Sequence, residues 1–223
     1  MKNIGGILFM GAQGNPQTEK ALKFLKVHFS NITVYLGEWK EPLPEAAYDW
    51  KGDYIISYFS RWIVPPKILR NAKLAAINFH PASPDYPGIG CNNFALYDGA
   101  SEYGVTCHHM LASVDTGEII KYKYFPLFAK ENVDTILTRT HDYLLILFYE
   151  VISILAETGV LPKSQKSWSR EPYTRAQLNE LSRLNPNMSV DEFERRIRAT
   201  SFNQWRPQVN IHGHTFELKN ERS

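Results

Sequence analysis

Short apolar runs alternate with stretches of helical spacing in the first part of the chain. Four runs have the length of buried strands; they lie at residues 4–10, 32–36, 53–59 and 74–79. Apolar residues at helical spacing follow the first run, and a short helix opened by Pro65-Pro66 follows the third. Strands that alternate with helices favour a mostly parallel sheet covered on both faces, so we expect an α/β fold.

A further strand pair and one long helix follow. Residues 103–110 and 119–125 predict two strands, joined by a loop that contains Asp115. Apolar residues then recur at helical spacing from 133 to 155, and Gly159 is a good C-terminal stop. This pattern predicts one long, buried helix.

The sequence changes character after Pro162. The polar stretch SQKSWSREP predicts a linker, and capping boxes at 174–177 and 189–192 each predict the start of a short helix. The alternation around His212-Gly213 predicts a β-hairpin. We therefore expect two parts, a main domain over residues 1–162 and a helical and β-hairpin extension over 163–223.

Composition narrows the possible functions. The chain has 223 residues, 43% hydrophobic and 22% charged, and its net charge of +2 makes no general case for nucleic-acid binding. The longest apolar run, about six residues, is far below the roughly 20 of a membrane span. The N-terminus reads as a first strand rather than a signal peptide. Cys91 and Cys107 have no metal-ligand spacing, which fits free thiols and a cytoplasmic protein.

The stretch INFHPASPDYPG, residues 77–88, is the strongest candidate for a site. Asn78 and His80 are two apart, so on a strand both point to the same side. The prolines and glycine that follow exclude a helix and hold a loop. Asp115 lies in the loop after a later strand and could return a carboxylate to the same crevice, where open parallel sheets bind ligands.

These three residue types suit an acyl transfer in which the substrate brings its own nucleophile. The Asn78 amide can donate to an oxyanion, His80 can move a proton or donate as well, and Asp115 can hold the histidine. Each motif alone is more often structural than catalytic: a lone Asn-x-His is commonly structural, and Asp115-Thr-Gly is usually a turn. The combination with the loop rich in proline and glycine favours a site. The sequence has no G-x-S-x-G motif, and Cys91 lies in a helix-like stretch.

Two other kinds of site compete. A metal could use His80, His108, His109 and Asp115, but the adjacent histidines point to opposite faces of a strand. The stretch GAQGN, 11–15, is too loose for a dinucleotide fingerprint and lacks the lysine of a phosphate-binding loop. Its backbone could still meet a phosphate at a helix start, or it could be a plain turn.

INFHPASPDYPG together with YGVTCHHMLASVDTGEII resembles the formyltransferases that use 10-formyltetrahydrofolate, over about residues 50–160. The resemblance implies a Rossmann-like formyltransferase domain, Asn78, His80 and Asp115 as the catalytic residues, and no metal. The stretch SYFSRWIVPP resembles the folate-binding loop, which implies a folate pocket formed by Arg61, Trp62, Ile63, Leu111, Ala112 and Val114. His108 falls where some relatives carry a supporting histidine. We expect the acceptor substrate at Gly11, Asn15, Tyr86, Gly88, Asn92 and Asn93.

The family formylates several amines. The helix-plus-hairpin tail looks most like the sugar N-formyltransferases, which act on nucleotide-linked amino sugars and would connect the protein with lipopolysaccharide O-antigen biosynthesis. The alternatives are a methionyl-tRNA or glycinamide ribonucleotide formyltransferase, or a folate-binding scaffold without activity. Because a lone hairpin exposes strand edges, we expect a homodimer through the apolar residues of the tail, Val209, Ile211, Phe216 and Leu218, with Trp205 nearby.

Overall fold

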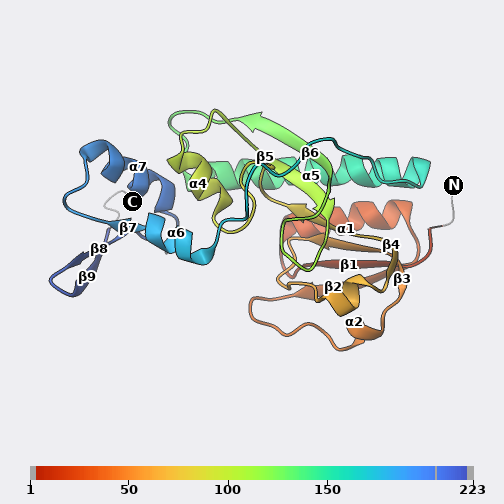
Figure 1. Ribbon diagram of the computed structural model, residues 1–223. Coiled ribbons are helices and arrows are strands. Elements are labelled where there is room, and N and C mark those ends of the chain that lie inside the picture. The colour runs from red at the N-terminus through yellow and green to blue at the C-terminus, as the bar shows by residue number, and fades with distance from the viewer. Residues whose placement is uncertain (1–3, 204, 220–223) are drawn as a thin grey trace.

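A six-stranded sheet in the order β2-β1-β3-β4-β5-β6 forms the centre of the computed structural model, which describes residues 4–203 and 205–219 (Figure 1). The first four strands in this order are parallel, and β5 and β6 are antiparallel additions. The strands are β1 (Ile7–Ala12), β2 (Ile32–Gly37), β3 (Gly52–Tyr58), β4 (Ala72–His80), β5 (Glu102–His109) and β6 (Ile119–Pro126). The α/β prediction is confirmed.

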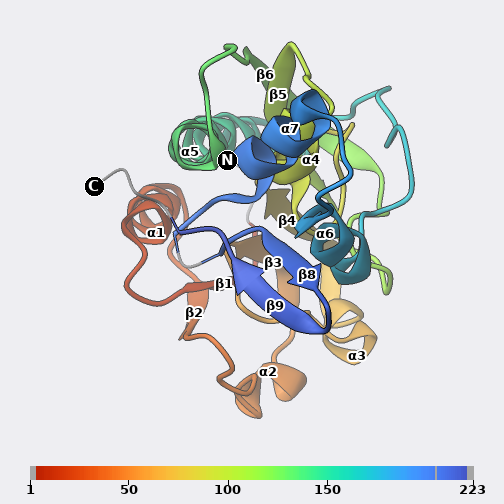
Figure 2. The ribbon, with the colours of Figure 1, turned by 90° about the vertical axis from the view of Figure 1, so that its left-hand side faces the viewer.

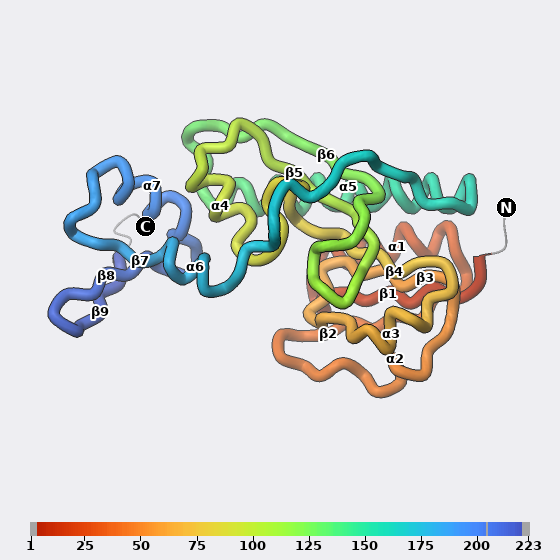
Figure 3. Tube along the Cα trace, viewed as in Figure 1, coloured from red at the N-terminus to blue at the C-terminus, as the bar shows by residue number. Residues whose placement is uncertain are grey.

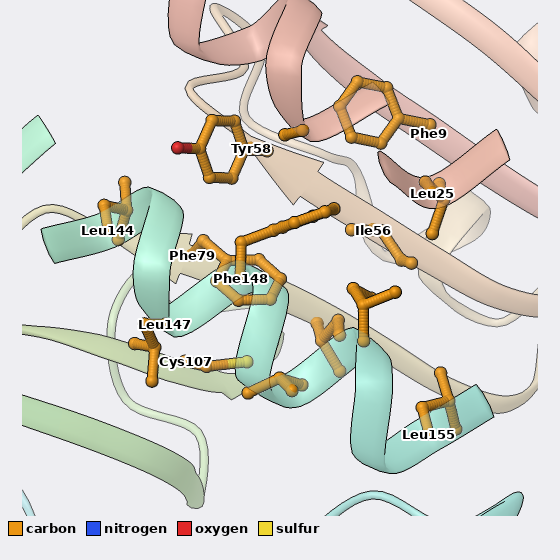
Figure 4. Packing of buried hydrophobic residues seen from close by; sticks show 14 of the residues in the cluster. Phe9, Leu25, Ile56, Tyr58, Phe79, Cys107, Leu144, Leu147, Phe148 and Leu155 are labelled. Carbon is orange, nitrogen blue, oxygen red and sulfur yellow. The ribbon is translucent and has the colours of Figure 1, made fainter. Parts of the chain in front are cut away.

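Helices cover both faces of this sheet. One face carries α1 (Pro16–His28) and α5 (Val133–Thr158), and the other carries α2 (Ala46–Asp49) and α3 (Pro66–Leu69). Alternate residues of β1 enter the two cores, so Phe9 packs under α5 whereas Leu8 packs towards α2 and α3. Figure 4 shows Phe148 of α5 among the rings of Phe9, Tyr58 and Phe79.

The long helix α5 begins and ends where the sequence indicates. The Asn132 side chain accepts from the Thr135 N–H, and the Thr135 side chain accepts from the Asn132 N–H. These two hydrogen bonds form a capping box. Gly159 ends the helix in the left-handed conformation, with φ +71°. This helix crosses the sheet under β4 and β5 and fixes the strand ends that carry the predicted site.

A third cluster of buried residues joins the sheet to the C-terminal extension. It contains α4 (Cys91–Tyr97) and the inner face of α7 (Val190–Thr200), which Figure 2 shows packed together. The remaining elements are α6 (Arg175–Leu181) and a small sheet of β7 (Arg183–Leu184), β8 (Gln208–Ile211) and β9 (His214–Glu217). The hairpin is confirmed; β7, which pairs in parallel with β8, is too short to leave a pattern in the sequence.

Residues 163–173, which contain the predicted linker SQKSWSREP, run back along the molecule in contact with the main domain (Figure 3). We call this segment the strap. Its Ser164, Ser169 and Tyr173 N–H groups donate to the carbonyls of Ile119, Pro84 and Pro87. The Tyr173 carbonyl in turn accepts from the Ile89 N–H. The strap therefore joins the extension to the loop after His80 by ordered backbone pairing. The division of the chain at residue 162 stays a prediction.

Within residues 4–203 and 205–219, none of the helices combines the length and the apolar character that crossing a bilayer requires.

Candidate active site

The ends of β4 and β5 bring four polar side chains to one cavity of about 630 Å³. Asn78 and His80 project from β4, and His108 lies opposite Asn78 in the antiparallel register. Asp115 reaches the same cavity from the loop between β5 and β6. The structure thus brings together the three residues predicted to be catalytic, together with His108.

Asp115 lies at the centre of a group of polar contacts. Its Oδ2 lies 3.5 Å from His80 Nδ1 and accepts from the Gly88 N–H at 3.1 Å, and its Oδ1 lies 3.3 Å from His108 Nε2. The backbone of Asp115 is left-handed, with φ +53°, a conformation that aspartate tolerates better than most residues. One carboxylate therefore orients both histidines.

Two glycines allow the loops to approach one another at this point. A Cβ on Gly88, whose φ is +94°, would lie 2.4 Å from the Tyr173 carbonyl of the strap. A Cβ on Gly117 would lie 1.9 Å from the His109 carbonyl, so the Asp-x-Gly turn fits against β5 only with glycine there.

Burial and hydrogen bonding set the charges in the site. Burial lowers the pKa of His80 below its usual value, although the Asp115 carboxylate opposes this effect. Burial alone would raise the pKa of Asp115, but the adjacent histidines and the Gly88 N–H outweigh it and lower that pKa overall. At neutral pH the site therefore holds a neutral His80 beside an ionised Asp115, which is the state that a general base requires.

His108 fixes the orientation of the Asn78 amide. Its Nδ1 lies 2.8 Å from the His109 carbonyl, which only accepts, so Nδ1 carries the proton. The Nε2 atom lies 3.2 Å from the Asn78 Nδ2 and 3.3 Å from the Asp115 Oδ1, and it engages at most one N–H of the amide. The second N–H of that amide is left to donate to an oxygen in the cavity. His109, the next residue, does not line this cavity.

Trp168 of the strap covers both histidines, and sequence reasoning missed it. Its ring centroid lies 5.2 Å from that of His108 and 6.1 Å from that of His80, in edge-to-face geometry. Its Nε1 donates to the Gly117 carbonyl at 2.8 Å. The one signal in the sequence is a lone tryptophan in a polar stretch, which indicates that the stretch is anchored.

Cys91, at the start of α4, also faces His80. Its Sγ lies 3.7 Å from His80 Nε2 and donates to the Gly88 carbonyl at 2.9 Å. Burial, with the nearby Asp115 charge, raises the pKa of this thiol to about 12, so the neutral thiol is the form present. In the part of the chain that the structure describes, no group of three or more potential ligands has the arrangement of a metal site.

Five of the six residues predicted to contact folate line the same cavity: Arg61, Trp62, Ile63, Leu111 and Val114. Ile63, Leu111 and Val114 are 78%, 55% and 51% exposed, which leaves an apolar mouth suited to a flat, partly apolar ring. Ala112 is exposed and is not part of the lining.

Trp62 anchors this loop from behind. A Cβ on Gly37 would lie 2.1 Å from its ring, and its indole N–H donates to the Glu41 carbonyl at 2.8 Å. Phe59, just before the loop, has φ +54°, which is rare for a bulky residue and is held by packing against Tyr58 and His141. The backbone of residues 60–64 is thus presented to the cavity in a fixed shape.

The residues predicted to contact the acceptor fall into two groups. Gly88 and Asn92 line the catalytic cavity, and Asn92 and Asn93 line a second cavity beside it. Neither cavity is lined by the other three. Gly11 lies within the sheet under Thr18, Asn15 caps α1, and Tyr86 is buried against Tyr103 and Tyr173. These three residues thus have packing or capping roles in the fold, and their positions give no support to contact with the substrate.

Comparison with known proteins identifies the class. The sequence profile of the formyl transferase family matches residues 33–152, more than half of the chain, so the chain belongs to this family. It is 31% identical over 138 residues to a methionyl-tRNA formyltransferase of Chlorobium phaeovibrioides, a match that covers 61% of this chain and 43% of that protein. The chain spans about half the length of the curated relatives it matches.

Solved structures share the fold along almost the whole chain. A sugar N-formyltransferase from a Shewanella species has a TM-score of 0.77 at 16% identity, over 96% of this chain and 97% of that one. The N-formyltransferase of Helicobacter canadensis, solved with folinic acid and dTDP-3-aminofucose, has a TM-score of 0.74 at 21% identity, over 93% and 84% of the two chains. At these identities the likeness establishes the fold alone.

Proposed function

We propose that this protein is an N-formyltransferase that moves a formyl group from 10-formyltetrahydrofolate to the primary amine of a nucleotide-linked amino sugar. The observation that carries the proposal is the meeting of Asn78, His80 and Asp115 in one cavity that also has an apolar mouth. Family membership supports the type of reaction.

Each residue has a distinct role in this proposal. The free N–H of the Asn78 amide stabilises negative charge that develops on the formyl oxygen as the amine attacks. His80, neutral because it is buried, accepts the proton that the attacking amine loses, directly or through a water held by Asp115. The bond between the formyl carbon and N10 of the folate would then break, and N10 would take up this proton as tetrahydrofolate leaves. Cys91 stays a neutral thiol and forms no covalent bond to the formyl group.

The proposed donor fits the other end of the cavity. The pterin ring would lie against Ile63, Leu111 and Val114 and exchange hydrogen bonds with the backbone of residues 60–64, which has a fixed shape. The folate supplies an activated formyl group. Among related structures, the Helicobacter canadensis enzyme was solved with folinic acid.

A nucleotide-linked amino sugar is favoured over tRNA as the acceptor. The Helicobacter canadensis enzyme, which shares this fold, was solved with a dTDP-linked amino sugar. In the present chain a second cavity of about 650 Å³, the size of a small-molecule site, adjoins the catalytic one. Methionyl-tRNA is the alternative acceptor because curated relatives that the sequence matches are methionyl-tRNA formyltransferases.

The test is a formylation assay with 10-formyltetrahydrofolate and a panel of acceptors: aminated dTDP- and UDP-sugars, glycinamide ribonucleotide and methionyl-tRNA. We expect transfer to at least one nucleotide sugar, detected by the mass of the formylated product. Transfer to methionyl-tRNA alone would show that the acceptor is methionyl-tRNA and not a nucleotide-linked amino sugar. Absence of transfer to every acceptor, with folate bound, would favour the non-catalytic alternative.

We also propose that the hairpin β8–β9 pairs two copies of the chain. Its register puts Val209, Ile211 and Phe216 on one face, with Ile211 and Phe216 43% and 53% exposed. Strand β9 is an edge of the small sheet. In a two-fold symmetric dimer, the hairpin of one copy would cover this edge and the apolar face of the hairpin in the other copy. Trp205, expected nearby, lines the second cavity together with the hairpin residues Gln208 and Glu217.

Sedimentation checks this pairing. Phe216→Asp places a charge on the apolar face and should convert a dimer into a monomer. The control is Thr215→Asp, on the opposite face of the same strand, which should remain a dimer. A monomeric parent protein would overturn the proposal.

A further inference from the structure

The second cavity lies between α4, α6 and the hairpin, and it is joined to the catalytic cavity. Four residues line both cavities and form what we call the throat: Gly90, Asn92, Leu137 and Arg175. The second cavity therefore adjoins the cavity that contains His80. None of the catalytic residues lines the second cavity, so its role is distinct from the chemistry.

The charge of this cavity favours an anion. Arg175, Arg183 and Arg206 line it against a single carboxylate, that of Glu217. Arg183 is paired with Glu180, whereas among the described residues Arg175 and Arg206 have no carboxylate within ion-pair distance. Two guanidinium groups thus remain available, and guanidinium matches phosphate oxygens with two parallel hydrogen bonds.

The same cavity offers a surface for a flat ring. Trp205 is 58% exposed and lies with Phe202 in the lining, and the Arg175 guanidinium stands 5.9 Å from the Trp205 ring. Asn93 also lines the cavity; its Nδ2 donates to the Ala199 carbonyl at 2.6 Å, so its Oδ1 is the atom left to accept a hydrogen bond. An aromatic face beside amide groups is how proteins bind a nucleobase.

We propose that the second cavity binds the nucleoside diphosphate of the acceptor. Arg175 holds the diphosphate at the throat, Arg206 supports it, and the base stacks on Trp205. The sugar then extends through the throat so that its amine reaches His80. This inference rests on the proposed function and adds to it where the nucleotide lies and which residues recognise it.

Nucleotide binding can be measured without formyl transfer. Calorimetry with dTDP, UDP, GDP and inorganic pyrophosphate should show at least one nucleoside diphosphate binding more tightly than pyrophosphate. Arg175→Gln and Trp205→Leu should each weaken that binding by about 10- to 100-fold, the effect of losing a charged hydrogen bond or a stacked base. Arg206→Gln is a second test of the phosphate contact.

The control is Arg70→Gln, an exposed arginine at the end of α3 that lines neither cavity. It should bind like the parent, and all variants should keep the parent's melting temperature. Failure of every nucleoside diphosphate to bind, or parent-like binding by both Arg175→Gln and Trp205→Leu, would overturn the inference.

The outcomes separate this inference from the proposed function. Binding that depends on Arg175 and Trp205, without formylation of any nucleotide sugar, would support the second cavity and contradict the reaction. Formylation of a nucleotide sugar with an unchanged KM in both variants would support the reaction and place the nucleotide elsewhere. Binding of tRNA, but not of free nucleotides, through the same arginines would show that the second cavity recognises a nucleic acid and not a nucleoside diphosphate.

Discussion

The two cavities are built in opposite ways. In the catalytic cavity His80, His108 and Asp115 are 6%, 2% and 5% exposed and stand at strand ends or next to them. The Asp115 carboxylate lies within 3.5 Å of a ring nitrogen of each histidine. In the second cavity Trp205 is 58% exposed, and the lining comes from short helices and the hairpin. The sheet thus fixes the groups of the catalytic cavity, whereas the extension, where we propose that the acceptor binds, has fewer internal constraints.

The largest expected effect lies in the catalytic cavity. Asn78→Ala and His80→Ala should each lower kcat by about 100- to 1000-fold, because each removes a group that acts on the developing charge or the proton. Asp115→Ala should lower kcat to a similar extent, because the carboxylate that orients His80 and His108 is lost. His109→Ala, next to His108 but outside the cavity, is the control. Near-normal turnover by a folded His80→Ala protein would contradict the mechanism.

The folate loop offers the next test, because its contribution is expected to come from the backbone. Ile63→Pro removes an N–H and restricts Trp62, so folate affinity measured by calorimetry should fall by at least about tenfold. Ile63→Ala keeps the backbone and should cost less, and Arg61→Ala should weaken binding modestly. Equal affinity in Ile63→Pro and the parent would place the pterin elsewhere.

The strap tests whether the catalytic cavity depends on a distant segment. Trp168→Ala opens the cover over His80 and His108, and we expect kcat to fall by about tenfold as the histidines lose their fixed position. Trp168→Phe keeps an aromatic cover without the bond to the Gly117 carbonyl and should lose less. Identical turnover in the alanine variant and the parent would show that the cover has no catalytic role.

The smallest effect concerns pH. Because burial lowers the pKa of His80 below its usual 6.5, kcat/KM should be level through neutral pH and fall only below about 6.5. Stability changes in the same direction: the unfolded chain takes up the His80 proton first, so acidification below pH 6.5 favours unfolding. Asp115, with its pKa lowered, contributes stability that is lost only at still lower pH.

Stability measured at pH 7.5 and 5.5 in the parent and in His80→Gln checks the histidine effect. The parent should lose more stability between these values than the variant does. A pH–rate profile that falls above pH 6.5 would contradict a neutral, buried histidine.

Sequence reasoning was strongest where one local pattern determines the structure. The alternation of strands and helices predicted the sheet, and the Asn78-x-His80 spacing with the Asp115 loop predicted three side chains that do meet. It was weakest where residues far apart in the chain come together. Trp168 lies in a stretch with the composition of a linker, and only the fold places it on His108.

The acceptor residues show the same limit. Gly11 lies inside β1 against Thr18, and the Asn15 side chain caps α1, so neither residue lines the two cavities. Tyr86 lies in the correct loop but turns into the core. Arg175 and Trp205 carry no motif, since their meeting depends on how the extension folds back.

The path of the strap has a consequence for how the protein is made. All three proposed catalytic residues have left the ribosome once Asp115 has emerged, but the cover over the histidines waits for Trp168 and the bond to Gly117. Domains fold largely in the order of synthesis, and contacts between distant segments form late. We therefore expect a nascent chain to hold a formed sheet and an uncovered pair of histidines until α5 is complete and the chain turns back across them.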